Sequence, residues 1–554
     1  MCILCDPGKP QFHSTSRRNF LKGTAATGLA AGAMTLLGPS AEAQGHNVNP
    51  PPHTGEPGRQ YVIRNGYVMT MEPGTPGANS SFGEFIEGDV FVEGKTIKAI
   101  GRNLQGRNAT AIDARGKVVM PGFIDTHHHQ AWTAIRSAIP DSILINDGTG
   151  TASAEQNYFE HVLAGQTGTT GFARHYRPQD VYVSELFGGL SQLDAGVTTV
   201  LDVSQIHHSP AHSDAAIQAL FDTGRRAAFG YFESAGNVAG NQYPQDATRI
   251  RNQWFFSSDQ LVHMIMGGEV YLGPATLTQS WTIGRQLGLQ IAAHILSPFG
   301  IRPTLDLLAQ GKGGINQNIG LGPDNLFIHM TGMSDLGWQA VHDAGAQVSI
   351  AFPIEMNMRH GMPPILKMQS LGMEPSLSVD VECTLTADFF TQMRSCMNLQ
   401  RVVLNQMILN QGFPPNEVDW GLPPDAAATP WPTPPAGTPA PLTTRDVLRF
   451  GTMNGAKALR LDGKTGSLTP GKEADIIILD ATRINVAPLN QVPGAVVSLM
   501  DRTNVETVIV AGKVRKWKGQ LLDVDLPHLR RQLETSRDYV FATAGIPQDL
   551  FRSN

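Results

Sequence analysis

Eight short apolar runs, separated by longer mixed stretches, recur along the middle of this 554-residue chain and restrict its fold more than any other feature. Each has the length of a buried strand, and amphipathic stretches such as Gln179–Ala195 and Ser334–Ala344 lie between several of them. The runs are Val118–Thr126, Thr198–Ser204, Ala227–Glu233, Glu269–Ala275, Leu289–Ile295, Asn325–Thr331, Gln347–Pro353 and Ser376–Glu382. This alternation predicts an α/β fold, a (β/α)8 barrel of the TIM type. A doubly wound open sheet is the alternative, but no Gly-x-Gly-x-x-Gly motif follows the first run.

Shorter β-like runs with turn signals flank the barrel region on both sides, at residues 61–117 and 465–520. We expect the two sets to form one small, discontinuous β-sandwich domain beside a barrel of residues 118–464. The remaining boundaries are a loose leader at 44–60, a Pro-rich excursion at 413–442 within the barrel region, and a C-terminal helix and tail at 521–554. Asp525 is a fitting N-cap for that helix, with Pro527 in its first turn.

Residues 1–43 have the layout of a targeting peptide. Ser16-Arg-Arg-Asn-Phe-Leu-Lys22 precedes a mild apolar run, and Ala41-Glu-Ala43 offers a cleavage site between small residues. The paired arginines in this context resemble a twin-arginine signal, the address of an export route that carries folded proteins. We therefore expect the export machinery as a partner and a periplasmic or extracytoplasmic location. Removal of this segment leaves Cys383 and Cys396, whose pairing the sequence does not reveal.

Composition excludes several other classes of partner. Charged residues make up 16% of the chain, the formal net charge is −6, and no block rich in Lys and Arg occurs, so nucleic acid is not an expected partner. Beyond the signal, no apolar run is long enough to span a bilayer. We expect a small molecule as the substrate.

Polar residues capable of binding a metal follow four of the eight runs. Side chains two apart on a strand face the same way, so His127 and His129 can meet at one point while His128 faces away. His294, His329 and Asp380 stand at the ends of later runs. Active sites of such barrels lie at the C-terminal ends of the strands, so these groups should meet.

Three imidazoles and one carboxylate suit a divalent transition metal, with zinc as the first expectation and iron as the alternative. A metal ion lowers the pKa of bound water, which then becomes a nucleophile. A neighbouring carboxylate can accept its proton, and an imidazole can polarise the bond being broken.

These residues resemble the amidohydrolase superfamily, in its branch of cytosine, guanine and S-adenosylhomocysteine deaminases and chlorohydrolases. The resemblance rests on Pro121-Gly-Phe-Ile-Asp-Thr-His-His-His129, the two later histidines, Asp380, and Gly466-Ser-Leu-Thr-Pro-Gly-Lys-Glu-Ala-Asp475. It implies one metal held by His127, His129, His294 and Asp380. It further implies that Asp380 shuttles protons and that His329 hydrogen-bonds water or substrate. No lysine stands at the expected end of the fourth strand, so a carboxylated lysine bridging two metals is not expected.

One position departs from that branch. Its deaminases carry a glutamate three residues after the fifth-strand histidine, where this chain has Ser297. A serine hydroxyl cannot supply a proton at neutral pH. Glu355 and His360, after the seventh run, and Glu382, two residues beyond Asp380, are the candidates for the missing acid.

Other polar residues are candidates for substrate contact, although solvated loop positions would look the same. Gln130 and Trp132 follow the first run, and His207, His208 and His212 follow the second. His175 and Arg177 are further candidates. The substrate-binding set that we predict is Gln130, Trp132, His207, Glu355 and His360.

The sequence thus predicts an exported, metal-dependent hydrolase that cleaves a non-peptide C–N bond in a small, cyclic, nitrogenous substrate. One alternative is hydrolysis of an exocyclic amide, carbamate or ring-halogen bond, which needs less acid assistance and suits Ser297. Another is a non-catalytic periplasmic binding protein that has lost the acid. The resemblance also implies a homo-oligomer.

Overall fold

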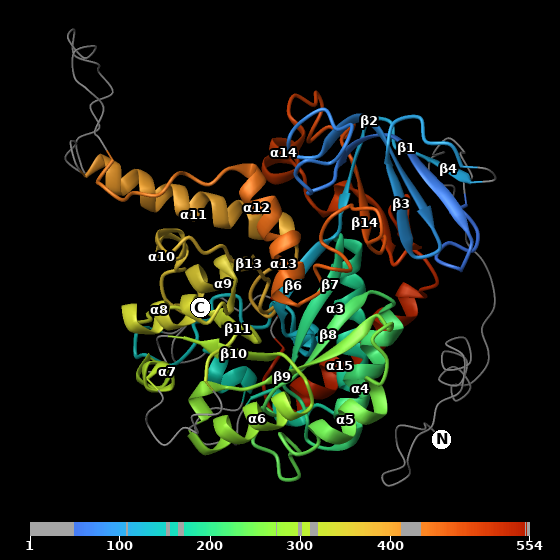
Figure 1. Cartoon of the computed structure of the whole chain (residues 1–554). Coiled ribbons are helices and arrows are strands. Elements are labelled where there is room, and N and C mark those ends of the chain that lie inside the picture. The colour runs from blue at the N-terminus through green and yellow to red at the C-terminus, as the bar shows by residue number, and fades with distance from the viewer. Residues whose placement is uncertain are drawn as a thin grey trace, which may run out of the picture.

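The computed structural model describes residues 49–106, 109–150, 156–163, 171–272, 274–296, 302–310, 320–410, 434–548 and 550. The predicted signal peptide, residues 413–433 of the Pro-rich excursion and Ser297 lie outside these residues. Two sheets organise the described chain. In Figure 1 a sheet of blue N-terminal strands and orange-red C-terminal strands stands above the green and yellow barrel.

The barrel has eight parallel strands that pair in chain order. They are β6 (Phe123–His128), β7 (Val197–Ser204), β8 (Arg226–Tyr231), β9 (Val262–Gly267), β10 (Ile291–Ile295), β11 (Asn325–His329), β12 (Gln347–Ile350) and β13 (Ser376–Leu377). The barrel closes just beyond β13, where the Asp380 N–H donates to the His127 carbonyl and the His129 N–H donates to the Asp380 carbonyl, both at 2.9 Å. The predicted fold class is confirmed.

The predicted fourth strand, Glu269–Ala275, is wrong. The strand is β9, seven residues earlier, and the predicted segment holds a 3-10 turn at Val270–Leu272 and the start of helix α6 (Pro274–Gln286). His263 interrupts the apolar pattern of β9, so this segment does not look like a buried strand in the sequence. Pro274 fits the first turn of a helix, where its missing N–H costs nothing, and does not suit a central strand.

The apolar run Val118–Thr126 is two strands in two sheets, so the prediction of one barrel strand is wrong in its first half. Strand β5 (Lys117–Pro121) belongs to the second sheet and β6 to the barrel. Gly122 lies between them, and a Cβ at this position would lie 2.1 Å from Cγ2 of Thr198. Only glycine lets the backbone pass this close to β7.

The second sheet unites the two ends of the chain. Its nine strands are β1 (Gln60–Met69), β2 (Glu84–Glu93), β3 (Thr96–Gly101), β4 (Thr110–Asp113), β5, β14 (Ile476–Asp480), β15 (Val505–Val510), β16 (Lys513–Trp517) and β17 (Gln520–Leu521). The N- and C-terminal parts join where β5 pairs antiparallel with β14. Because β5 leads into β6 after one residue, this sheet directly positions the first barrel strand.

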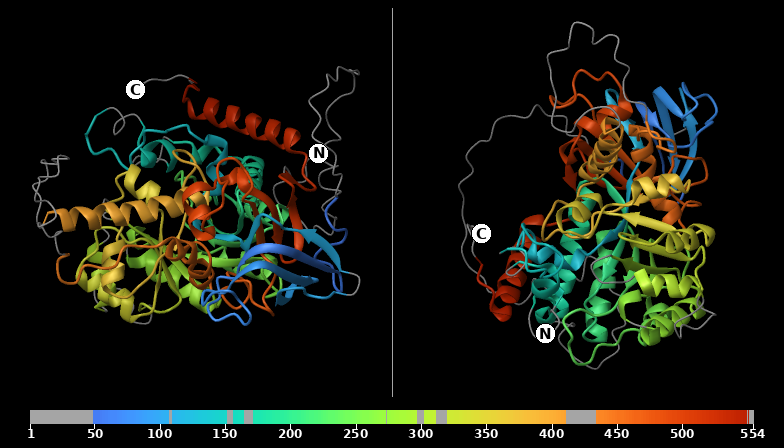
Figure 2. Two further views of the ribbon diagram at one scale, coloured as in Figure 1. Left: turned by 90° about the horizontal axis from the view of Figure 1, so that it is seen from above. Right: turned by 90° about the vertical axis from the view of Figure 1, so that its left-hand side faces the viewer.

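Most helices of the described chain lie around the barrel (Figure 2), and a few lie beside the second sheet (Figure 1). They are α3 (Pro178–Asp194), α4 (Pro210–Thr223), α5 (Ala247–Trp254), α6, α7 (Arg302–Ala309), α8 (Asp335–Asp343), α9 (Phe352–Asn357), α10 (Ile365–Ser370), α11 (Phe389–Leu409), α12 (Thr444–Phe450), α13 (Met453–Ala458), α14 (Val492–Gly494) and α15 (Leu526–Ala544). None of those in the described residues is long and apolar enough to cross a membrane. Asp525 caps α15 by accepting from the His528 N–H, and Ser536 on α15 donates to Asp180 on α3.

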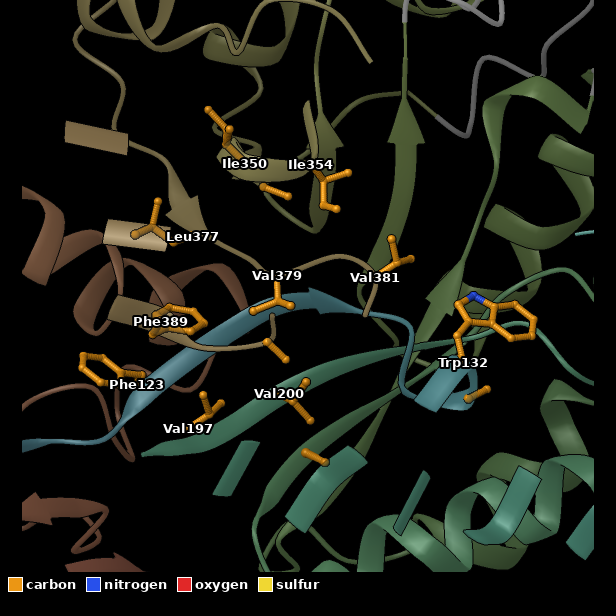
Figure 3. Packing of buried hydrophobic residues seen from close by; sticks show 14 of the residues in the cluster. Phe123, Trp132, Val197, Val200, Ile350, Ile354, Leu377, Val379, Val381 and Phe389 are labelled. Carbon is orange, nitrogen blue, oxygen red and sulfur yellow. The ribbon is translucent and has the colours of Figure 1, made fainter. Parts of the chain in front are cut away.

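The apolar core fixes the start of β6. Phe123 stacks on Phe389 with ring centroids 5.5 Å apart and meets Phe390 edge-on at 5.3 Å. Figure 3 shows Phe123 beside Phe389, with Val197 and Val200 of β7 below the same strand. Such aromatic packing anchors the end of β6 opposite to the one that carries the histidines.

Candidate metal centre

Four buried side chains meet at the C-terminal ends of β6 and β10 and just beyond β13. Nε2 of His127 lies 2.9 Å from Nε2 of His129 and 3.1 Å from Nε2 of His294. Oδ1 of Asp380 lies 3.6 Å from Nε2 of His127 and 3.6 Å from Nε2 of His129. None of the four residues is more than 6% exposed. We call His127, His129, His294 and Asp380 the histidine cluster.

The donor set of the histidine cluster fits one divalent metal. Burial holds the pKa of His127 and His129 well below the ordinary histidine value, so both are neutral lone-pair donors. Neutral imidazoles have too few N–H donors for every one of these converging Nε2 atoms to be hydrogen-bonded to another. The ligand atoms around one zinc ion normally lie about 3–4 Å from one another, so a single ion could bind them all. Within the described residues, two groups of side chains bring their ligand atoms within 4.8 Å of one another: His127, His129 and His294, and His127, His329 and Asp380.

Glu269 fixes the orientation of His294. Its Oε1 lies 2.5 Å from Nδ1 of His294, and its Oε2 accepts the His294 backbone N–H at 2.9 Å. Burial, the largest single influence, lowers the pKa of His294, but the charge and hydrogen bond of Glu269 and the charges of Glu233 and Asp380 together outweigh it and raise that pKa. Such a carboxylate selects the tautomer whose Nε2 would be available to bind a metal. The sequence prediction missed Glu269 because it placed this residue inside a strand rather than after one.

Asp380 faces two different groups with its two oxygens. Oδ1 faces His127 and His129, whereas Oδ2 lies 3.6 Å from Nε2 of His329 and 3.8 Å from Nε2 of His360. Burial raises the pKa of Asp380 to about 7. This carboxylate can therefore contact a metal on one side and exchange a proton on the other.

The backbone at two of these positions is strained. His329 and Asp380 both have φ of +71°, in the left-handed region that non-glycine residues rarely adopt. Such a conformation costs about 1–3 kcal/mol and persists only where surrounding structure imposes it. This backbone conformation directs both side chains into the pocket at the points where the chain continues beyond β11 and β13.

The predicted substrate-binding residues divide into three groups. His360 lines the pocket. Trp132 and Glu355 do not line the pocket but contact residues that do. Trp132 donates a hydrogen bond to the hydroxyl of Tyr158, and Glu355 lies 2.9 Å from Nδ1 of His329. The structure does not bring Gln130 or His207 to this pocket. Gln130 bonds Glu185 and Arg225, and His207 bonds Ser213 and the Ser204 carbonyl.

Two residues proposed as other candidates also have partners of their own. Glu382 accepts a hydrogen bond from the guanidinium of Arg136 at 2.7 Å. The guanidinium of Arg177 lies 3.4 Å from the ring centroid of Tyr539. Cys383 and Cys396 are both buried and free.

The pocket above the histidine cluster combines a polar floor with apolar walls. The described residues that line it are His129, Leu144, Tyr158, Phe159, Leu163, Gln205, Tyr271, His294, Leu296, His329, His360 and Asp380. No lysine or arginine is among them. Apolar and aromatic walls with a few convergent polar groups are typical of sites for small ligands.

A family model described as "Amidohydrolase family" matches residues 118–419 and 436–515. The chain belongs to the amidohydrolase family. It is an enzyme of the amidohydrolase type, a hydrolase acting on carbon–nitrogen bonds other than peptide bonds. A second model, for twin-arginine translocation signals, matches residues 14–38, so this amidohydrolase is exported and extracytoplasmic.

Curated relatives cover most of the chain. A 5'-deoxyadenosine deaminase of Methanosarcina barkeri is 26% identical over 479 residues, covering 84% of this chain and 94% of the relative. A 5-methylthioadenosine/S-adenosylhomocysteine deaminase of Thermococcus kodakarensis is 24% identical over 460 residues, covering 82% and 93%.

Solved structures share the fold. An adenosine deaminase from Xanthomonas campestris with bound zinc has a TM-score of 0.68 at 19% identity, covering 88% of this chain and 99% of that one. The atrazine chlorohydrolase of Arthrobacter aurescens TC1 complexed with zinc has a TM-score of 0.66 at 18% identity, covering 86% and 100%.

Proposed function

We propose that this exported amidohydrolase cleaves a non-peptide C–N bond in a small, cyclic, nitrogenous substrate without net charge. The observation that carries the proposal is the convergence of three Nε2 atoms and Asp380 at the floor of an apolar pocket. The wall of Leu144, Tyr158 and Phe159 suits a flat ring, and no cationic side chain is available among the described lining residues to bind a carboxylate or phosphate.

In this proposal His127, His129, His294 and Asp380 hold one divalent ion, zinc before iron. When bound, such an ion would acidify water and polarise the bond under attack. Asp380 accepts the proton of the attacking water, because its Oδ2 faces away from the histidines of β6. Glu355 holds Nδ1 of His329, so Nε2 of His329 is placed to hydrogen-bond the attacking water or the charge that develops on the substrate.

The names of the curated relatives favour deamination of an adenosine-like compound. The alternative, hydrolysis of an exocyclic amide, carbamate or ring-halogen bond, is supported by Ser297, which removes an expected acid, and by the fold shared with a chlorohydrolase. Ammonia is released only in deamination, so its assay separates the two. We also propose a homo-oligomer, to be tested by mass measurement in solution.

The test uses the purified mature protein, stripped of metal by a chelator and reloaded separately with zinc and iron. It is then offered 5'-deoxyadenosine, 5-methylthioadenosine and panels of cyclic amides, carbamates and chlorinated heterocycles. We expect turnover only with metal, and its loss in Asp380→Asn. Metal binding without turnover of any of these compounds would overturn the proposal and favour the non-catalytic binding protein.

A further inference from the structure

Gln205 is a pocket residue whose side-chain amide is bonded at one end only. It is the first residue beyond β7, lines the pocket together with His294 and Asp380, and is 3% exposed. Its Nε2 donates to Oε1 of Glu233 at 2.7 Å. Its Oε1 is buried and has no hydrogen-bond partner among the described residues. The protein therefore satisfies the donor of this amide and leaves its acceptor open.

Glu233 determines which end of the Gln205 amide is bonded. Oε1 of Glu233 accepts the hydroxyl hydrogen of Tyr271 as well as the amide hydrogen of Gln205. Two hydrogens directed at one oxygen mark it as an acceptor without a hydrogen of its own. If the amide of Gln205 were flipped, two acceptor oxygens would lie against each other, so its nitrogen must face Glu233.

The main chain at Gln205 is held as firmly as the side chain. The Gln205 carbonyl accepts the Ala235 N–H at 2.8 Å, and the Ser204 carbonyl accepts the Phe232 N–H at 3.2 Å. These two bonds join the end of β7 to the segment beyond β8 that carries Glu233. Because the backbone and Nε2 are both fixed, Oε1 is an acceptor in a fixed position.

A fixed and unpartnered acceptor at a pocket wall favours one kind of ligand group. Buried polar atoms without partners are few in native proteins. Oδ2 of Asp380, which also belongs to a lining residue, is likewise buried and without a hydrogen-bond partner in the described part of the chain. A site whose polar groups are completed by the substrate discriminates against analogues that lack the matching group. Oε1 of Gln205 can only accept, so the matching group is a hydrogen-bond donor.

We propose that Oε1 of Gln205 accepts a hydrogen bond from an N–H group of the substrate and so selects heterocycles that carry one. Glu233 acts through Gln205 as a positioning residue. The inference deepens the proposed function, on which it rests for the class of substrate. The N–H group belongs either to the ring itself or to an amino substituent, and the experiment separates these two sources.

The test uses two pairs of flat, uncharged probes that resist hydrolysis. 2-Pyridone has a ring N–H that N-methyl-2-pyridone lacks, and aniline has an amino N–H that N,N-dimethylaniline lacks. Dissociation constants for the zinc-loaded wild type are measured by ligand-observed NMR titration. We expect the N–H probe of at least one pair to bind about 3–10-fold more tightly than its methylated partner, the worth of one neutral hydrogen bond. No measurable affinity for any of the four probes would overturn the proposal.

A methyl group also adds bulk, so a variant separates hydrogen bonding from size. Gln205→Met has nearly the same length and volume but no acceptor oxygen. We expect the N–H probe to lose about 3–10-fold in affinity for this variant, while the methylated probe binds as it does to the wild type. An unchanged ratio of the two dissociation constants would show that the pocket selects by size alone and would overturn the proposal.

Two changes at Glu233 test its positioning role. Glu233→Gln keeps an oxygen that can accept from Nε2 of Gln205, so the preference for the N–H probe should persist. Glu233→Met removes that oxygen and lets the amide of Gln205 turn, so the preference should shrink. Equal losses of preference in the two variants would overturn the positioning role of Glu233.

The matched control is Gln290→Met. Gln290 is a buried glutamine whose Nε2 donates to the Ala458 carbonyl at 2.6 Å and whose Oε1 also has no partner among the described residues. It is not among the described residues that line the pocket, so this variant should keep the wild-type ratio of dissociation constants. A preference for the N–H probe without turnover of any compound would sink only the proposed function. Turnover without that preference would sink only the role of Gln205.

Discussion

Two buried polar clusters lie close together in this amidohydrolase and differ in how their charges are balanced. The first is the histidine cluster. The second, the Arg225 cluster, consists of Arg225, Gln130, Gln192, Asp125 and Glu185. Arg225 donates to Gln192 at 2.7 Å and to Gln130, which in turn bind Asp125 and Glu185 at 2.6 and 3.1 Å.

The difference is the presence of a cation. The Arg225 cluster contains its own positive charge, and its amides connect that charge to buried carboxylates. The histidine cluster has no arginine or lysine within hydrogen-bond reach among the described residues, and its nitrogens converge without donors between them. A buried polar group needs a partner. The Arg225 cluster therefore carries its own counter-charge, whereas the histidine cluster would gain one only with an ion.

The largest effect should follow removal of a group from the histidine cluster. We expect His127→Ala to lower turnover by about 10³-fold or more and to abolish stoichiometric metal, measured by elemental analysis, while circular dichroism shows a folded protein. The control is His128→Asn, on the same strand but facing away. Metal retained at full occupancy in His127→Ala would break the distinction between the clusters.

Removal of the cation from the Arg225 cluster should act on stability instead. Arg225→Met leaves buried carboxylates without a counter-charge, so the free energy of unfolding should fall by about 3–5 kcal/mol. Denaturant titration measures this loss. Adding Glu185→Gln should recover part of it. The folded fraction should still bind one metal, and a loss of metal affinity in parallel would mean that the clusters are one unit.

A smaller effect should follow from loosening one ligand of the histidine cluster without removing it. Glu269→Gln keeps the shape of the side chain but weakens its hold on Nδ1 of His294. Metal affinity, measured by competition with a chelator, should fall about 10–100-fold. An unchanged dissociation constant would show that the strand alone orients His294.

The smallest effect concerns a buried imidazole of neither cluster. His207→Leu removes the hydrogen bonds to Ser213 and the Ser204 carbonyl and should cost about 1 kcal/mol of unfolding free energy. KM and metal content should stay at the wild-type values. A raised KM would instead support the sequence-based hypothesis that His207 binds substrate.

The sequence predicted the barrel and the meeting of the histidines because both follow from local patterns. Apolar runs of strand length recur at βα spacing, and His127 and His129 share a face by simple alternation. Two strands were misjudged for local reasons as well. His263 conceals β9, while Val118–Pro121 has the same pattern as a barrel strand although it pairs with β14, which is distant in sequence.

Partners that are far apart in sequence could not be predicted. The pairs are Glu269 with His294, Glu355 with His329 and Glu233 with Tyr271. No local sequence pattern identifies them. A correct position for β9 would have placed Glu269 after a strand end, which is the signal that marked the other site residues. His207 carries the same signal, since it follows β7, yet its partners are structural.

The backbone bonds that close the barrel belong to the same residues whose side chains form the histidine cluster. His127 and Asp380 lie on opposite sides of that junction, about 250 residues apart along the chain. A metal ion held by both would be a cross-link between the beginning and the end of the barrel. The site cannot form before Asp380 has been synthesised, so binding of an ion by both residues would require a chain whose barrel has closed. For a protein addressed to a route that exports folded chains, the ion would then be inside before the membrane is crossed.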